Sequence, residues 1–146
     1  MEPRMLQSYI QEADAFLPQL VEASSALCVA IEDETLARRA LKDAESSLSA
    51  AEAEIVMDAE LASSTDKTGP LAGIAKTSKT YAYALESLLS KERGNGSAIG
   101  YLSAEARRLQ GAADNAAIDR QQAETRFAAV RHAADLMAAI LKAASV

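Results

Sequence analysis

Residues 20–55 read LVEASSALCVAIEDETLARRALKDAESSLSAAEAEI, and a seven-residue repeat in this stretch decides the fold. One position of the repeat holds Leu20, Leu27, Glu34, Leu41, Leu48 and Ile55. The position three residues later holds Ala23, Ala30, Ala37, Ala44, Ala51 and Asp58. Large residues alternating with alanines predict a narrow coiled-coil seam, because alanine lets a partner helix come close. We expect the seam to open at Glu34 and Asp58, where charged residues interrupt it.

The residues before this stretch predict a short amphipathic helix over residues 5–17. Its apolar side is expected to hold Leu6, Ile10, Ala13 and Leu17. Pro18 has no backbone N–H and disfavours helical geometry in the residue before it, so it predicts a break. The long helix is therefore expected over residues 19–61.

Two turn-rich stretches divide the remainder of the chain. Residues 63–70 predict a loop that leads into a helix over residues 71–92, with Pro70 at its first position. Gly94-Asn95-Gly96 predicts a second turn, and Ser97 is expected to cap a final helix over residues 97–144. That helix carries a stripe spaced by four and three, which Arg120 alone interrupts: Leu109, Ala113, Ala116, Arg120, Ala123, Phe127, Val130, Ala134, Met137 and Leu141.

These elements predict an all-α fold in one helical domain over residues 1–146. The expected architecture is an elongated hairpin or bundle of two long helices with shorter ones, packed through alanine and leucine. Aromatic residues make up only 4% of the chain, so close packing of helices through small residues is easier than filling a thick core. A lone hairpin of this length leaves much of each stripe exposed, which favours a homo-oligomer.

Residues that usually carry catalysis are sparse. Cys28 lies in an apolar run and is expected to be buried, while the one histidine, His132, lies far along the chain. This pair provides no zinc site, and the Glu-x-x-His pattern of helical di-iron proteins is missing. We therefore expect no enzyme, no cofactor and no metal. The lack of about 18 uninterrupted apolar residues and of a signal-peptide pattern predicts a cytoplasmic protein without a membrane span.

The net charge of −6 divides unevenly along the chain. Residues 1–65 carry four basic and thirteen acidic groups (4 − 13 = −9), and residues 66–146 carry eleven and eight (11 − 8 = +3). Residues 67–108 alone carry seven basic and three acidic groups (7 − 3 = +4). One explanation is that the acidic helix pairs with the basic remainder across the hairpin. The other is a site for an anionic ligand near the helix ends.

Residues 69–83 form the most site-like segment. Lys76, Lys79 and Tyr83 recur at helical spacing, and Thr80 lies near the face that they share. Two ammonium groups, a hydroxyl and an aromatic ring suit a nucleotide or a nucleic acid, because cations bind phosphate and the ring stacks on a base. The alternative is a solvated lysine face with tyrosines that cover the edge of the core.

Arg107 and Arg108 complete this ligand-binding set if the last helix folds back toward it. The segment is not a phosphate-binding P-loop, since the pattern G-x-x-x-x-G-K-[ST] and a preceding strand are both missing. The basic residues therefore have to converge through the tertiary structure.

The order of these features resembles a known group of proteins. The run Ala44-Glu45 to Ala51-Glu52-Ala53-Glu54 is followed by a glycine-bearing turn, a Lys/Tyr helix and an Arg-rich terminal helix. Over residues 36–142 this layout resembles small phage-encoded helical-hairpin accessory proteins. Some of those are similar to recombination mediators or single-strand-binding helpers, and others are oligomeric antagonists of bacterial immunity that hold a signalling nucleotide without cleaving it.

Three functions remain open at this stage. The first is a homo-oligomer that sequesters a small phosphate-bearing nucleotide in the host cytoplasm. The second is a recombination mediator or helper that binds single-stranded nucleic acid, which needs an extended basic track. The third is a protein–protein scaffold that uses its apolar stripes, in which Lys76 and Lys79 are dispensable and Leu48 or Leu109 is essential.

Overall fold

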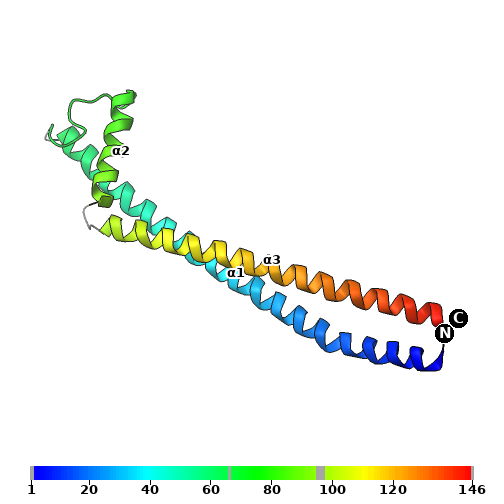
Figure 1. Cartoon of the computed structure of the whole chain (residues 1–146). Coiled ribbons are helices and arrows are strands. Elements are labelled where there is room, and N and C mark those ends of the chain that lie inside the picture. Colours follow the sequence, from blue (N-terminus) through cyan, green and yellow to red (C-terminus); the bar gives the residue numbers. More distant parts are fainter. Residues whose placement is uncertain (1, 66, 95–97, 146) are drawn as a thin grey trace. The chain divides into compact units, whose positions relative to one another are not determined.

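The computed structural model describes residues 2–65, 67–94 and 98–145, and helices account for nearly all of them. They are α1 (Pro3–Thr65), α2 (Lys79–Gly94) and α3 (Ala98–Ala144), and no strand occurs among the described residues (Figure 1). The predicted all-α fold class, with α1 packed on α3 as a hairpin, is confirmed.

The chain forms two compact units. Unit 1 contains residues 1–37 and 113–146, and unit 2 contains residues 38–112. Whether the two act as the one domain that the sequence suggests stays a prediction.

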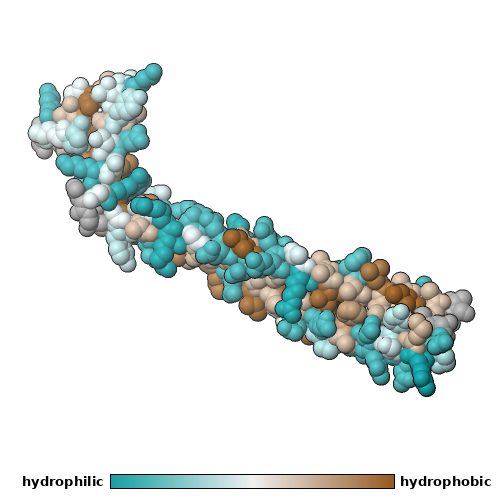
Figure 2. All heavy atoms as spheres, viewed as in Figure 1, coloured by the Kyte–Doolittle hydropathy of each residue, from teal (hydrophilic) through white to brown (hydrophobic). Residues whose placement is uncertain are grey.

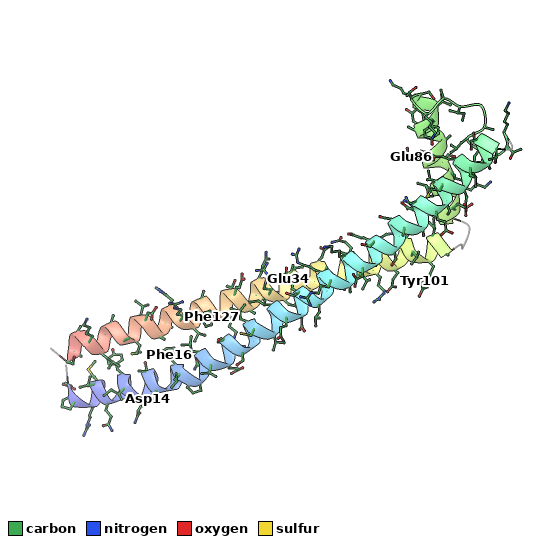
Figure 3. The ribbon with its side chains drawn as sticks, turned by 180° about the vertical axis from the view of Figure 1, so that it is seen from behind. Asp14, Phe16, Glu34, Glu86, Tyr101 and Phe127 are labelled. Carbon is green, nitrogen blue, oxygen red and sulfur yellow. The ribbon has the colours of Figure 1, made fainter. Side chains whose placement is uncertain are left out.

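Unit 1 is an antiparallel pair formed by the first half of α1 and the second half of α3. Its chain ends lie at the same end of the pair (Figure 1). Ala23 of α1 and Ala113 of α3 are buried, and the other predicted seam positions of this unit are partly or fully covered. Phe16 and Phe127 are labelled on the two facing helices in Figure 3. The predicted seam is therefore the face that packs.

Pro18 does not end a helix, because α1 runs through it. The prediction of separate helices over residues 5–17 and 19–61 is wrong. The seam continues before the proline in unchanged register through partly covered Leu6, Tyr9, Ala13 and Phe16. Pro18 itself is exposed, so its ring meets no packed neighbour. The packed seam on both sides of Pro18 compensates for the one backbone hydrogen bond that proline cannot donate.

The same register corrects the expected apolar face of residues 5–17. Ile10 and Leu17 were expected inside and are exposed, while Tyr9 and Phe16 take their place. The expectation of a buried Cys28 is wrong as well, because its thiol is exposed. Cys28 lies one residue after Leu27, and this step of about 100° along a helix rotates it out of the seam.

The interruption at Glu34 does not open the seam. Glu34 is buried, and Arg120 Nε of α3 donates a hydrogen bond to its carboxylate. Arg120 Nη1 also donates to Glu124 Oε1 at 2.7 Å. These bonds, first that with Glu124 and then that with Glu34, raise the pKa of Arg120. The two charged interruptions of the two apolar stripes thus meet and neutralise each other.

Unit 2 packs α2 against the last turns of α1. Tyr81, near the start of α2, binds Glu60, and Arg93, near its end, binds Glu52, so the two helices are antiparallel. The buried residues Ala59, Leu71 and Ile99 form its core. Asp58, the second interruption of the seam, is exposed.

The loop between α1 and α2 extends further than predicted, because α2 begins at Lys79 and not at residue 71. Gly69 and Gly73 have φ values of +88° and +73°, which lie in the left-handed region and interrupt helical geometry. Ser78 begins the helix instead: its Oγ accepts a hydrogen bond from Tyr81 N at 3.2 Å, as an N-cap does. Residues 95–97, including the predicted cap Ser97, lie outside the described residues.

Gly100 allows the end of α2 to approach the start of α3. A Cβ atom at this position would lie 2.6 Å from the carbonyl oxygen of Arg93, closer than two such atoms can pack. The connection between α2 and α3 therefore requires a residue without a side chain.

One described helix, α1, contains an 18-residue window that is long and apolar enough to cross a membrane by length and composition. The absence of a membrane span and the cytoplasmic location stay predictions.

Candidate functional site

The predicted basic cluster is divided among three places in unit 2: the loop before α2, the first turns of α2, and α3. Lys76 lies in the loop before α2, so it does not share a helical face with Lys79 and Tyr83. Lys79, Thr80 and Tyr83 lie in the first turns of α2 and are exposed, with 70% of Tyr83 accessible to solvent.

Arg107 and Arg108 lie on α3 and are also exposed. Lys79 lies at the start of α2, and Figure 1 shows that α3 starts beside the other end of α2. The two ends of α2 are about 24 Å apart at 1.5 Å per residue. Arg108 donates from Nη2 to Glu105 Oε1 at 2.5 Å, and this bond raises the pKa of Arg108 and lowers that of Glu105. The arginines are therefore not brought to the Lys79 end of α2, and a ligand site built from all six residues stays a prediction.

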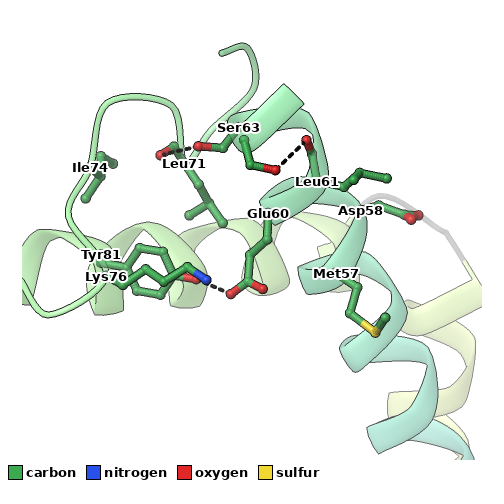
Figure 4. A pocket seen from close by; sticks show the side chains of 10 residues that line it. Met57, Asp58, Glu60, Leu61, Ser63, Leu71, Ile74, Lys76 and Tyr81 are labelled. Atoms are coloured by element: carbon green, nitrogen blue, oxygen red, sulfur yellow. Dashed lines mark hydrogen bonds between the residues drawn. The ribbon is translucent and has the colours of Figure 1, made fainter. Parts of the chain in front are cut away.

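A cavity of about 440 Å³ lies between the end of α1, the loop and α2 (Figure 4). Its apolar lining includes Leu71, which is 1% exposed, and Ile74. The polar lining includes Asp58, Glu60 and Lys76. Lys76 is the member of the predicted set that lines this cavity, and two carboxylates accompany it.

Hydrogen bonds fix the walls of this cavity. Ser63 Oγ donates to the carbonyl oxygen of Leu71 at 3.2 Å, which ties the loop to α1. The Tyr81 hydroxyl donates to Glu60 Oε1 (Figure 4). This hydrogen bond is the main cause that raises the pKa of Tyr81 above its ordinary value of 10.0. The wall of the cavity therefore combines one ammonium group with two carboxylates, and one of these already accepts a hydrogen bond from tyrosine.

Acidic residues of α1 form ion pairs with basic residues of the later helices. Arg93 binds Glu52 in unit 2. In unit 1, Arg120 binds Glu34 and Arg126 binds Glu22 at 3.1 Å. Each of these pairs joins a carboxylate of α1 to a guanidinium from a later helix. The pairing explanation of the charge asymmetry is thus confirmed for these residues.

A second stripe on α1 of unit 1 leaves large apolar side chains exposed. It consists of Leu17, Val21, Ser24, Cys28, Ile31 and Thr35, and we call it the second stripe. Its spacing of 4, 3, 4, 3 and 4 residues places all six on one side of the helix. Leu17, Val21 and Ile31 are 66%, 57% and 45% exposed. Figure 2 shows brown, hydrophobic residues among teal ones on the visible face of unit 1, where both α1 and α3 lie.

The polar members of the second stripe suit burial against another helix. Thr35 Oγ1 donates to the carbonyl oxygen of Ile31 at 2.9 Å, so its hydroxyl is already satisfied within α1. Cys28 behaves as a small apolar side chain with a weak donor. The second stripe carries no formal charge between residues 17 and 35.

The signal for this surface is present in the sequence. Residues 17–35 hold two interleaved repeats of the same spacing, and only the stronger one, with leucine at Leu20 and Leu27, was assigned to packing. The structure separates them, because one repeat faces α3 and the other, except for half-buried Ser24, faces solvent.

No group of three or more His, Cys, Asp or Glu side chains in the described residues could hold a metal ion. Comparison with protein-family models, curated proteins and solved structures finds no match to this chain. What the fold and the surface define is an all-α helical hairpin with an unpartnered apolar stripe, and the resemblance to phage accessory proteins stays a prediction.

Proposed function

We propose that this protein is a non-catalytic helical scaffold that acts by packing its second stripe against another α-helix. The observation that carries the proposal is the regular exposure of Leu17, Val21 and Ile31 at helix-pairing spacing. Apolar anchors at this spacing are the usual way in which one amphipathic helix recognises another.

The energetic reason is the apolar area that the second stripe leaves in water. Covering one large apolar side chain completely contributes about 1.5–3 kcal/mol relative to full exposure. Because Leu17, Val21 and Ile31 are about half exposed or more, covering the three contributes roughly 2–5 kcal/mol before the entropy cost of association. This free energy is enough to favour association with a partner helix, but it is small enough that the chain can also exist without one.

Cys28 provides a direct test, because the sole cysteine of the chain lies in the middle of the second stripe. In cells that express the chain, a membrane-permeable thiol reagent should label Cys28 slowly if a helix covers it. The matched control is Cys28→Ser/Leu36→Cys, which moves the thiol to an exposed position outside the stripe and should be labelled quickly. Equally fast labelling of both thiols in cells would contradict the scaffold function.

A nucleotide-sequestering function is the second candidate, and the observation that favours it is that Lys76 lines a cavity of nucleotide-compatible size. Calorimetry with a panel of nucleotides tests this candidate. Binding that is lost in Lys76→Ala would support it, and no heat with any nucleotide would contradict it. A gel-shift assay at several salt concentrations tests single-stranded nucleic acid in the same way.

A further inference from the structure

We infer that the helix which covers the second stripe is the second stripe of another copy of this chain, packed antiparallel. This inference rests on the proposed scaffold function and names its partner. In the inferred register Ser24 of one copy faces Cys28 of the other, so that a twofold axis passes at the level of residue 26.

The segment of α1 that carries the second stripe needs a cover. From residue 15 to residue 31 the one charged side chain is Glu22, and the helix is apolar on several sides at once. A helix of this kind is ordinarily buried, and the facing helix α3 covers only the seam.

A bilayer is a poorer cover than a protein. Glu22 binds Arg126 in the middle of this segment, and buried Glu34 binds partly exposed Arg120 about three turns beyond. The part of α3 that packs against the segment carries further charges at Asp119, Glu124 and Arg131. Inserting the pair of helices would place several charges in hydrocarbon, and each of them is strongly unfavourable there.

The second stripe is complementary to itself when it is reversed. Its spacing reads the same in both directions, so an antiparallel copy pairs Leu17 with Thr35, Val21 with Ile31 and Ser24 with Cys28. Each of the outer pairs contains one large apolar residue beside a β-branched one. The central pair is small, which lets the two backbones approach as alanine does in the seam within the chain.

Charges at the two ends of the second stripe select the same orientation. In the sequence, Asp14 precedes Leu17 by three residues and Arg38 follows Thr35 by three residues, so both continue the spacing. An antiparallel pairing brings Asp14 of one copy to Arg38 of the other, twice by symmetry, in addition to the interaction that Arg38 makes within its own chain. A parallel pairing brings the two Asp14 side chains together and the two Arg38 side chains together, which is repulsive.

Disulfide trapping tests the register with the full chain. The variants are Cys28→Ser/Val21→Cys and Cys28→Ser/Ile31→Cys, one of them carrying a tag that changes its size, mixed and exposed to a mild oxidant. We expect a cross-linked dimer of one tagged and one untagged chain, and little cross-linking of either variant alone. Cross-linking of each variant with itself, with none between the two, would show a parallel pairing and overturn the inference.

Charge reversal gives a second, independent measurement by sedimentation equilibrium. Asp14→Arg alone and Arg38→Asp alone should each weaken dimerisation about fivefold, since two exposed ion pairs are lost by symmetry. The double variant should recover the wild-type affinity, and circular dichroism should show unchanged helicity in all three. A double variant that is weaker than both single variants would contradict the pairing of Asp14 with Arg38.

Failure of this inference and failure of the scaffold function give different results. If Cys28 is protected in cells while the purified chain stays monomeric and does not cross-link, the partner is another protein and only the inference is overturned. If Cys28 is unprotected in cells, both are overturned. Both are supported if Cys28 is protected in cells and if the protection of Cys28 in the purified chain rises with the concentration of that chain.

Discussion

Replacing Leu71 by alanine tests whether one buried side chain holds the loop of unit 2 in place. Leu71 is 1% exposed and lies in a segment without regular helix, between Gly69 and Gly73. The change removes roughly three methylene equivalents, or about 2.4 kcal/mol of transfer free energy at about 0.8 kcal/mol each. A cavity term adds to this, so we expect the free energy of unfolding of unit 2 to fall by about 3 kcal/mol.

Leu61→Ala is the matched control, because Leu61 lines the same cavity but is 61% exposed. It should cost less than about 1 kcal/mol, since most of its side chain is already in water. Urea denaturation followed by circular dichroism measures both variants, and hydrogen exchange locates the loss. In Leu71→Ala the amides of Thr68, Ala72 and Ile74, which donate hydrogen bonds to α1 and to the loop, should exchange faster.

The comparison between the two leucines decides the outcome. Equal losses of stability in Leu71→Ala and Leu61→Ala would mean that the loop is not anchored by burial. Unchanged exchange of the loop amides in Leu71→Ala would refute the reasoning in the same way. Exchange of unit 1, residues 113–144, should not change in either variant.

Three further perturbations have defined outcomes. Gly100→Ala should lower the melting temperature, because its Cβ would clash with the carbonyl of the last turn of α2, whereas Gly111→Ala should not, since its Cβ would meet open space. Arg120→Leu should destabilise unit 1 by removing the guanidinium that binds the buried carboxylate of Glu34, and adding Glu34→Leu should restore the melting temperature or raise it; a double variant as unstable as the single one would contradict the pairing. Glu60→Gln should lower the pKa of Tyr81 toward its ordinary value in an absorbance titration. In the wild type, the stability that this hydrogen bond contributes should be present below about pH 10 and should disappear as the pH rises through the raised pKa of Tyr81.

The site was less predictable than the fold, and the reason lies at particular residues. Lys76, Lys79 and Tyr83 have helical spacing in the sequence, but the left-handed conformation of Gly73 and the N-cap at Ser78 delay the helix until residue 79. Spacing along a chain predicts a shared face only where the helix exists. The second stripe is the opposite case. Its spacing does lie on a helix, but the stronger repeat of leucine and alanine in the same residues makes it harder to recognise.

The sequence by itself determined that the chain is helical and which residues form the seam, because both follow from local periodicity. Its alternation of leucine and alanine predicted the covered face of α1, and the stripe on α3 likewise. Local periodicity does not state which charged residue meets which, whether a proline is tolerated, or which of two apolar faces finds a partner. Those were decided only by tertiary packing: Glu34 and Arg120 are 86 residues apart and become a neutral pair only when the helices align. Pro18 stays helical because the seam on both sides of it is held by α3.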